Sequence, residues 1–203
     1  MHGRAPLPSQ PFAPGLKVGL LGGSFNPAHE GHRWISLVAL RRLGLHQVWW
    51  LVSPQNPLKP KSGMAPLAAR MASARAVADH PAIVISDLEA RLGSRYTIDT
   101  LHALRRRAPA THFVFLMGAD NFIALPRWRD WTGIMESVPI AVIARPGYSL
   151  KARLSQPARH YAHRQLAQTD ARLLAQTPPP AWVFLEDRPT PISSTAIRAG
   201  RKG

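Results

Sequence analysis

The amino-acid sequence predicts a doubly wound, Rossmann-like α/β fold built on a parallel sheet. Six short runs rich in Val, Ile, Phe and Trp alternate with stretches of helical periodicity, an order that is typical of parallel strands joined by helices. The chain has 203 residues, 45% of them hydrophobic, and can bury one sizeable core, so we expect a single domain. In such a fold a ligand binds outside the carboxyl ends of the strands, where the strand order reverses.

The expected strands are spread over the chain after residue 16. They cover 17–21 (KVGLL), 48–52 (VWWLV), 82–86 (AIVIS), 112–117 (HFVFLM), 139–144 (PIAVIA) and 182–186 (WVFLE). Trp49 and Trp50 lie within the second run, and we interpret both as core residues.

Helices are predicted between these strands. One begins near His29 or Glu30, directly after the first strand. Two more are marked by apolar residues at helical spacing: Leu67, Met71, Ala74 and Val77 in one, and Ile98, Leu101 and Leu104 in the other. No Pro- or Gly-rich connection is flanked by a composition shift that would mark a second domain.

A formal net charge of +15 predicts attraction to polyanions, either nucleic acid or polyphosphate ligands. The basic residues are scattered and do not form one stripe interleaved with aromatic residues. The densest run, 105–107, ends a predicted helix, where cations interact favourably with the helix dipole. This placement favours a solvated helix end, and the charge alone does not decide between the two classes of ligand.

The absence of cysteine excludes a disulfide framework, thiolate-bound iron–sulfur clusters and a thiol nucleophile, and it fits a reducing cytoplasm. The Pro-rich residues 1–16 lack the apolar segment of a signal peptide, and no stretch approaches the roughly 18 apolar residues of a membrane span. We therefore expect a cytoplasmic protein with a disordered extension over 1–16 and the domain over 17–203.

Residues 22–32, GGSFNPAHEGH, place two glycines and two histidines at the turn from the first strand into the next helix. Glycine allows backbone amides to approach a ligand closely, and a helix N-terminus carries partial positive charge, so the turn is suited to phosphate. His29 and His32 lie three residues apart and project from one face of the first helical turn.

The two histidines have several competing interpretations. A zinc site would need a third protein ligand, and the nearest carboxylate, Glu30, points to a different face, so we expect no protein-bound metal. Alternatively, both rings are polar groups satisfied at a helix start. Donation of hydrogen bonds to phosphate oxygens is the interpretation that also explains the glycines.

Residues 191–198, PISSTAIR, place a second polar cluster before a predicted helix near the end of the sequence. Ser194 and Arg198 lie one turn apart on one face. The hydroxyls form an ordinary N-cap in the simpler interpretation, while hydroxyls, free amides and a guanidinium together also suit a triphosphate.

These two stretches together resemble the signatures of the nucleotidyltransferase superfamily with the (H/T)-x-G-H motif. Between them, 94–101 (SRYTIDTL), 118–131 (GADNFIALPRWRDW) and 144–148 (ARPGY) resemble, in order, segments of the bacterial nicotinate-nucleotide adenylyltransferases. The resemblance spans roughly residues 17–200. It implies transfer of an adenylyl group from ATP to nicotinate mononucleotide, giving deamido-NAD and pyrophosphate, with Mg²⁺ carried by ATP.

The resemblance also implies roles for individual residues. His29, His32 and Arg198 become the catalytic residues, in contact with the ATP phosphates. The implied ATP-binding residues are Gly22, Gly23, Ser24, Phe25, Lys59, Gly118, Asp120, Ser193 and Ser194. The implied nicotinate-nucleotide contacts are Tyr96, Thr97 and Trp128. ATP and nicotinate mononucleotide are the expected partners, and no binding to nucleic acid or to a membrane is expected. The sequence is compatible with either a monomer or a homo-oligomer.

The attacking group of this reaction is a phosphate oxygen that is already ionised at neutral pH, so no general base is needed and positioning and charge stabilisation suffice. The chain has only 11 Asp and Glu residues, and none of them forms a convincing acid/base pair in the sequence, which agrees with this mechanism. Asp87 and Glu89, and likewise Glu186 and Asp187, are interpreted as surface or strand-end charges and not as acid/base pairs.

The sequence departs from the family at a few positions. Ser24 and Asn26 stand where the family often has Thr and Asp, and an amide at position 26 cannot act as a carboxylate base. Only five residues follow Arg198, where family members commonly continue with a helical tail, so the resemblance does not specify the packing at the end of the last helix.

Two other functions remain as alternatives. One is an adenylyltransferase for phosphopantetheine, which would not need the Tyr96–Thr97 and Leu125–Trp128 segments. The other is a basic nucleic-acid-binding protein without catalysis, whose affinity would fall steeply with salt.

Overall fold

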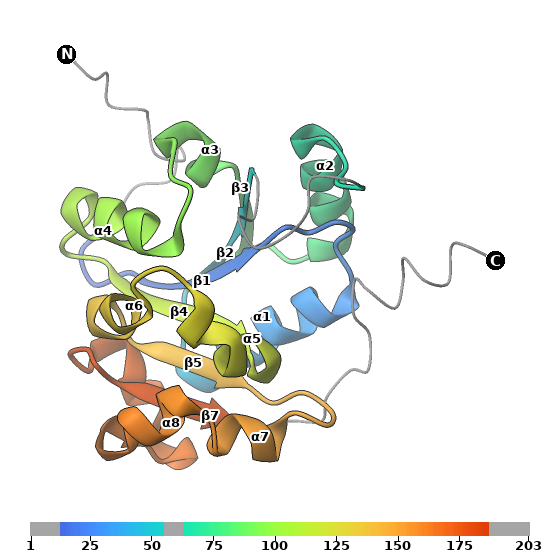
Figure 1. Cartoon of the computed structure of the whole chain (residues 1–203). Helices are drawn as coiled ribbons and strands as arrows, with labels where there is room; N and C mark the ends of the chain where they lie inside the picture. The colour runs from blue at the N-terminus through green and yellow to red at the C-terminus, as the bar shows by residue number, and fades with distance from the viewer. Residues whose placement is uncertain (1–12, 55–62, 187–203) are drawn as a thin grey trace.

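The computed structural model, which describes residues 13–54 and 63–186, contains a seven-stranded, all-parallel sheet (Figure 1). Its strands are β1 Lys17–Gly23, β2 Gln47–Val52, β3 Ile83–Ser86, β4 His112–Gly118, β5 Ile140–Ile143, β6 Gln165–Leu166 and β7 Trp182–Leu185. The strand order is β3-β2-β1-β4-β5-β7-β6. The predicted doubly wound architecture and all six predicted strands are therefore confirmed, while β6 was missed.

Helices cover both faces of the sheet. The α-helices are α1 Glu30–Leu43, α2 Leu67–Ala78, α3 Leu88–Leu92, α4 Thr97–Arg107, α5 Ala119–Ala124, α6 Trp131–Ser137, α7 Ser149–Arg153 and α8 Gln156–His160. The 3-10 helices are η1 Leu125–Arg127, η2 Ala162–Arg164 and η3 Gln168–Gln176. One core layer contains buried residues of α1, α2 and η3, and the other contains residues of α3 to α8.

The strands are apolar on both sides because each one lies between the two helical layers. Along β2, Trp49 belongs to one core layer and Trp50 to the other, and their exposed fractions are 1% and 0%. Their interpretation as core residues is confirmed. Successive side chains of a strand point to the two core layers in turn, so both faces must be apolar. This explains why each strand is a continuous apolar run and does not alternate with polar residues.

The strand order places the switch point between β1 and β4. β1 pairs with β2 on one side and with β4 on the other, and Leu21 of β1 lies opposite Leu116 of β4. The chain leaves β1 through Gly22 and Gly23, while it leaves β4 through Gly118. A ligand at this edge meets the ends of both strands.

The start of the described chain is tied to the opposite edge of the sheet. Residues 13–16, which fall within the predicted extension, lie in a turn, and the amide of Gly15 donates to the carbonyl of Ala110 at 2.9 Å. Leu16 packs against one core layer. Among the helices described, none combines the length and the apolar character needed to cross a membrane.

Candidate active site

The turn after β1 is shaped by the two histidines themselves, because His29 is the N-cap of α1. Its Nδ1 accepts a hydrogen bond from the amide of Gly31 at 3.1 Å, and Nδ1 of His32 accepts from the amide of His29 at 3.2 Å. This reciprocal pair is a capping box with imidazoles in place of the usual hydroxyl and carboxylate. Two backbone amides that begin a helix without partners are satisfied in this way.

The capping bonds determine where the imidazole protons lie. Because each Nδ1 accepts a bond, each neutral ring carries its proton on Nε2. Burial, with a smaller contribution from the Arg145 cation, lowers the pKa of His29 to about 4, so this ring is neutral at physiological pH. The ring centroids of His29 and His32 lie 3.8 Å apart, which brings the two side chains to one volume. Each ring therefore has the tautomer needed to donate an N–H to a phosphate oxygen.

An aromatic stack lies behind these rings. Phe25 has a φ of 45°, a left-handed conformation that turns its side chain into the core, where it is 1% exposed. Its ring stacks on Trp50 at 5.0 Å and lies 4.6 Å from the ring of His32. A Cβ on Gly23 would come within 3.2 Å of the Phe25 ring, so the glycine leaves room for the stack.

Helix α2 holds the same turn from the side. Asn26 donates from Nδ2 to the carbonyl of Gly63 at 3.0 Å, and its Oδ1 accepts from the amide of Ala65 at 3.2 Å. Both bonds join the turn to the segment that leads into α2. Since an aspartate at position 26 could not make the donation to Gly63, the amide is suited to this tether.

Arg70 of α2 joins three segments through its guanidinium, although the residue is only 2% exposed. Its N–H groups donate to the backbone carbonyls of Ser24, Ser53, Pro54 and Ala65, at 2.7 to 3.1 Å. The acceptors lie after β1, after β2 and before α2. The buried cation is thus satisfied by four carbonyl oxygens, and it connects the ends of two neighbouring strands.

The end of β4 is shaped by an ion pair between Asp120 and Arg145. Nε of Arg145 lies 3.4 Å from Oδ1 of Asp120. A Cβ on Gly118 would lie 2.5 Å from that carboxylate oxygen and 2.8 Å from the guanidinium Nε, so a side chain at this position would displace the pair. Arg145 follows β5 and also affects His29, which places its positive charge beside the phosphate turn.

A cavity of about 520 Å³ opens beside the β1 turn. It is lined by Gly22, Gly23 and Ser24, by Arg95, Tyr96 and Thr97, by Arg127, Trp128 and Arg129, and by Ser53, Glu89, Phe115, Asn121 and Ile134. Its walls are aromatic, since the rings of Phe115 and Trp128 meet edge to face at 6.3 Å and the Arg129 guanidinium lies 4.6 Å from the Tyr96 ring centroid. Its volume is suited to a small flat ring with attached polar groups.

The N-terminus of α4 faces this cavity. Tyr96 is the N-cap of the helix and makes no side-chain capping bond, while its carbonyl accepts from the amide of Asp99 at 3.1 Å. The amides of Thr97 and Ile98, which precede Asp99, therefore keep their donor capacity. With three arginines among the lining residues, this end of the cavity favours an anion such as a carboxylate.

Comparisons with known proteins agree with this geometry. The profile of the cytidylyltransferase-like family matches residues 20–200. A Parvibaculum lavamentivorans protein named "Probable nicotinate-nucleotide adenylyltransferase" is 57% identical over 92% of this chain and 93% of its own length. A Cereibacter sphaeroides protein of the same name is 56% identical over 91% of this chain and 97% of its own. The chain belongs to the nicotinate-nucleotide adenylyltransferase family.

A solved structure extends the comparison to the fold. The Plasmodium falciparum nicotinic acid mononucleotide adenylyltransferase complexed with NaAD superposes with a TM-score of 0.68. The match covers 91% of this chain and 83% of that one, at 16% identity. The Rossmann-like nucleotidyltransferase fold is thereby shown. The predicted resemblance to the nicotinate-nucleotide adenylyltransferase family is confirmed by the sequence relatives.

The structure brings most of the described candidate residues to one edge of the sheet. Gly22, Gly23, Ser24, Tyr96, Thr97 and Trp128 line the cavity. His29, His32, Gly118 and Asp120 lie at the adjoining ends of β1 and β4. Phe25 differs, because its side chain lies in the core behind the histidines. Lys59, Ser193, Ser194 and Arg198 lie outside the described residues, so their assignments remain predictions of the family resemblance.

Several residues at this edge were missed by sequence reasoning. Arg95, Arg127 and Arg129 line the cavity, yet in the sequence they resemble any of the other scattered cations. Arg145 lies within the ARPGY segment, so the resemblance located its segment but gave it no role. Glu89 was interpreted as a surface or strand-end charge; it does follow the end of β3, but it is partly buried and lines the cavity, which the sequence pattern did not indicate.

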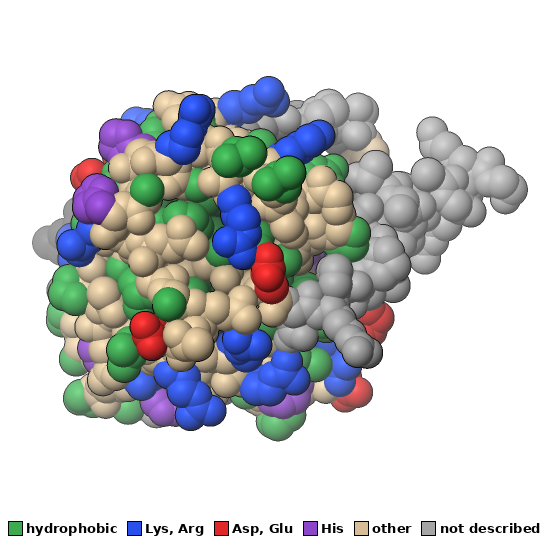
Figure 2. All heavy atoms as spheres, turned by 90° about the horizontal axis from the view of Figure 1, so that it is seen from below, with side chains coloured by type: hydrophobic (Ala, Val, Ile, Leu, Met, Phe, Trp, Pro, Cys, Tyr) green, Lys and Arg blue, Asp and Glu red, His purple; other side chains and the backbone are tan. Residues whose placement is uncertain are grey.

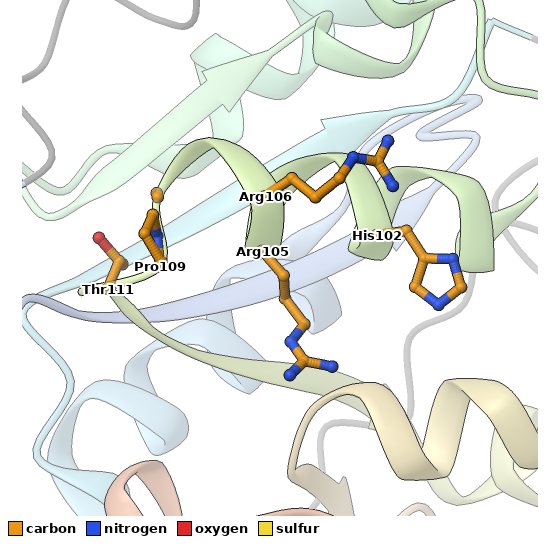
Figure 3. Close-up of a pocket in the computed structure, with 6 residues that line it drawn as sticks. His102, Arg105, Arg106, Pro109 and Thr111 are labelled. Carbon is orange, nitrogen blue, oxygen red and sulfur yellow. The ribbon is translucent and has the colours of Figure 1, made fainter.

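A second hollow, of about 350 Å³, lies at the other edge of the sheet. It surrounds the C-terminal end of α4 and Thr111, the residue before β4 (Figure 3). Arg105 and Arg106 leave α4 in different directions, so their guanidinium groups do not converge on one ligand. They lie in the last turn of α4, where cations stabilise the helix dipole, as the sequence predicted for this run.

Proposed function

We propose that this protein transfers the adenylyl group of ATP to nicotinate mononucleotide, forming deamido-NAD and pyrophosphate in the biosynthesis of NAD. The observation that carries the proposal is the meeting of two unlike sites at one switch point. The β1 turn with His29 and His32 is suited to phosphates, and the aromatic cavity beside it is suited to a pyridine ring. Gly22, Gly23 and Ser24 line that cavity and lead into the phosphate turn, so both substrates meet there.

In the proposed reaction, a phosphate oxygen of nicotinate mononucleotide attacks the α-phosphorus of ATP, and the bond to the pyrophosphate leaving group breaks. The attacking oxygen carries its negative charge before the reaction, so no proton has to be removed. His29 and His32 donate from Nε2 to phosphate oxygens as charge moves toward the leaving group. Arg145 adds a fixed positive charge beside His29. Catalysis then depends on positioning and on preorganised donors.

Residues outside the described chain complete the proposed triphosphate site. Lys59 follows β2, and Ser193, Ser194 and Arg198 belong to the PISSTAIR stretch. We assign these four side chains to the ATP phosphates on the strength of the family resemblance. Their hydroxyl and cationic groups are of the types that bind phosphate.

Magnesium enters the proposed site with the nucleotide. Among the described residues, no group of three or more His, Cys, Asp or Glu side chains could hold a metal ion. His29 and His32 present N–H donors and not lone pairs toward the phosphate volume, which suits phosphate oxygens and not a cation. Mg²⁺ bound to the ATP phosphates would supply charge neutralisation during the transfer.

The acceptor cavity favours nicotinate mononucleotide over phosphopantetheine. Trp128, Tyr96 and Phe115 provide flat apolar walls for a pyridine ring, and the start of α4 with its neighbouring arginines provides donors for a carboxylate. Phosphopantetheine has neither a ring nor a carboxylate to use them. A nucleic-acid-binding protein without catalysis would need no enclosed cavity at this edge.

The proposal is tested by measuring pyrophosphate release with ATP, Mg²⁺ and one acceptor at a time. Nicotinate mononucleotide should give rapid release, and phosphopantetheine should give none above the background without acceptor. Release with phosphopantetheine alone would assign the chain to a different reaction. Salt-sensitive binding of nucleic acid without release with any acceptor would favour the non-catalytic alternative.

A further inference from the structure

Glu89 is the one acidic side chain among the described residues that line the acceptor cavity. It lies in α3, and the hydroxyls of Ser53 and Thr100 donate to its carboxyl group. Its backbone carbonyl accepts from the amide of Ser94 at 3.0 Å, and Ser94 Oγ lies 2.7 Å from Thr100 Oγ1. The side chain is therefore fixed between the end of β2 and the first turns of α4, next to Tyr96 and Thr97.

The charged groups around Glu89 do not neutralise it. In the described part of the chain Glu89 takes part in no ion pair. Arg95, Arg127 and Arg129 line the same cavity, while Asp87 and Arg91 of α3 pair with each other at 2.8 Å. The guanidinium of Arg70, on the β2 side, is bound to backbone carbonyls that include that of Ser53. Burial raises the pKa of Glu89 to about 7, against the smaller opposite effect of the two hydroxyls.

A second carboxylate bound at the start of α4 would share the cavity with Glu89, because Glu89, Tyr96 and Thr97 all line it. Two ionised carboxylates within a partly dehydrated site repel each other, and the site is relieved when one of them takes up a proton. An acid–carboxylate pair then shares that proton in a charge-assisted hydrogen bond. A carboxamide in the same place carries no charge and can instead donate its N–H to an ionised glutamate.

We propose that Glu89 binds the acceptor as the neutral acid and donates its proton to the pyridine carboxylate, so that it helps to distinguish nicotinate from nicotinamide nucleotides. This inference rests on the proposed function, because it assumes that the pyridine ring occupies the cavity. The proton comes from solvent when the ligand binds, and no covalent bond other than that O–H bond forms. Selectivity for the carboxylate must therefore depend on pH.

The proton is measured most cleanly with a pair of dinucleotides, deamido-NAD and NAD. They differ only in carboxylate against carboxamide, and their diphosphates do not titrate near neutral pH, whereas the phosphate of a mononucleotide does. Calorimetric titration in two buffers of different ionisation enthalpy gives the number of protons taken up. We expect uptake on the order of half a proton or more for deamido-NAD at about pH 7.5, and none for NAD.

The affinity should change with pH in a defined direction. Binding of the carboxylate raises the pKa of Glu89 above its value in the free protein, so affinity for deamido-NAD is constant below about pH 7 and weakens above it, on the order of tenfold per pH unit. The affinity for NAD should stay level or improve over the same range. The ratio of the two dissociation constants therefore favours deamido-NAD most strongly in mild acid.

Glu89→Gln is the decisive variant, because the amide keeps an oxygen for Ser53 and Thr100 but has no titrating proton. It should remove both the proton uptake and the pH dependence. Asp99→Asn, which changes an exposed carboxylate of α4, is the matched control and should behave as the parent. Thr100→Val is a second variant, since loss of one donor to the ionised form raises the pKa of Glu89 and moves the weakening of affinity to higher pH.

Each outcome has one meaning. Binding of both dinucleotides with equal proton uptake, or proton uptake that persists in Glu89→Gln, overturns the role of Glu89 and leaves the proposed function intact. Failure of both dinucleotides to bind at all overturns the proposed function, and the inference falls with it. Proton uptake for deamido-NAD alone, lost in Glu89→Gln and kept in Asp99→Asn, establishes it.

Discussion

At the scale of single residues, His29 and His32 each use one imidazole for two purposes. One ring nitrogen satisfies a backbone amide at the start of α1, and the other is left with the N–H that we assign to phosphate. The sequence offered these as competing interpretations, a polar pair at a helix start or a pair of phosphate donors. The hydrogen bonds make the two interpretations compatible, because a neutral ring whose Nδ1 accepts a capping bond carries its proton on Nε2.

His29→Asn separates the two roles. Asparagine is a strong N-cap, so the melting temperature should stay within a few degrees of the parent, whereas turnover should fall on the order of a hundredfold because one donor to the reacting phosphates is lost. His29→Ala should lose turnover and also about 1 kcal/mol of stability. Thermal unfolding and pyrophosphate release measured on the same samples check this. Near-normal turnover of the asparagine variant would reduce His29 to a cap.

The shifted pKa of His29 also predicts how stability depends on acid. Its pKa is about 4 in the folded chain against 6.5 in the unfolded one, so the unfolded state binds more protons between these values. This contribution is complete above pH 6.5 and is lost as pH falls toward 4. Glu89, with its raised pKa, opposes it by losing stability as pH rises toward 7. As the pH falls over this range, the melting temperature of His29→Asn should therefore decrease less steeply than that of the parent. The melting temperature of the control Asp99→Asn should decrease about as steeply as that of the parent.

At the scale of elements, helix α2 supports the phosphate turn although it contributes no residue to the cavity lining. Asn26 and Arg70 connect the turn to α2 and its approach, and Ser73 of α2 accepts from the amide of Ala28 through its Oγ at 3.3 Å. These bonds reach the turn at its beginning, middle and end. The position of the turn is thus determined by a helix from a different crossover.

Arg70→Lys tests this support. Lysine cannot donate to four carbonyls in a planar fork, so we expect a loss of about 2–3 kcal/mol in the free energy of unfolding and a raised KM for ATP. Arg75→Lys, at an exposed position of the same helix, is the control and should leave both quantities unchanged. Denaturant unfolding and initial rates over a range of ATP concentrations measure the two effects. If Arg70→Lys keeps the parental KM for ATP and the parental free energy of unfolding, Arg70 does not support the phosphate turn.

The PISSTAIR element supplies a second test at this scale. If Arg198 grips the triphosphate, Arg198→Lys should lower ATP-dependent turnover with the melting temperature within a few degrees of the parent, because lysine loses the fork that binds two oxygens. Ser193→Ala should do little to stability beyond about 1 kcal/mol if the hydroxyl is only a cap. A lowered melting temperature with intact turnover in Arg198→Lys would assign the arginine to the fold.

The limits of sequence reasoning are visible in the same elements. The continuous apolar runs of β1, β2 and β4 are typical of strands that are covered by helices on both faces, so their positions were predictable. The edge strand β6 has two residues and no pattern to detect. The positions of Glu89 and Arg145 at the site were not predicted for another reason, since they depend on burial and on neighbours from other strands. The family resemblance supplied the positions Tyr96, Thr97 and Trp128, which periodicity could not.

At the scale of the whole molecule, the positive charge and the cavity address the same substrates. Both substrates and both products are anionic, and a net charge of +15 favours their approach from any direction. On the face in Figure 2, Lys and Arg side chains lie in several places among hydrophobic and His residues and do not form one continuous stripe. The positive charge therefore attracts anions in general, and the choice among anionic substrates depends on the cavity at the switch point.

The central claim is that this cavity selects a pyridine carboxylate for adenylyl transfer. Trp128→Ala should raise the KM for nicotinate mononucleotide on the order of tenfold while the KM for ATP stays near the parental value, because the ring loses one aromatic wall. Initial rates at fixed saturating ATP, and again at fixed saturating acceptor, separate the two constants. Equal changes in both would mean that Trp128 acts through the fold.

The most direct test is the ratio of kcat/KM for nicotinate mononucleotide to that for nicotinamide mononucleotide, measured by pyrophosphate release under identical conditions. The two acceptors differ by carboxylate against amide, and the start of α4, three arginines and the shared proton of Glu89 all favour the former. We predict a ratio on the order of a hundred or more near neutral pH. A ratio near one would contradict the assignment of the cavity to a pyridine carboxylate.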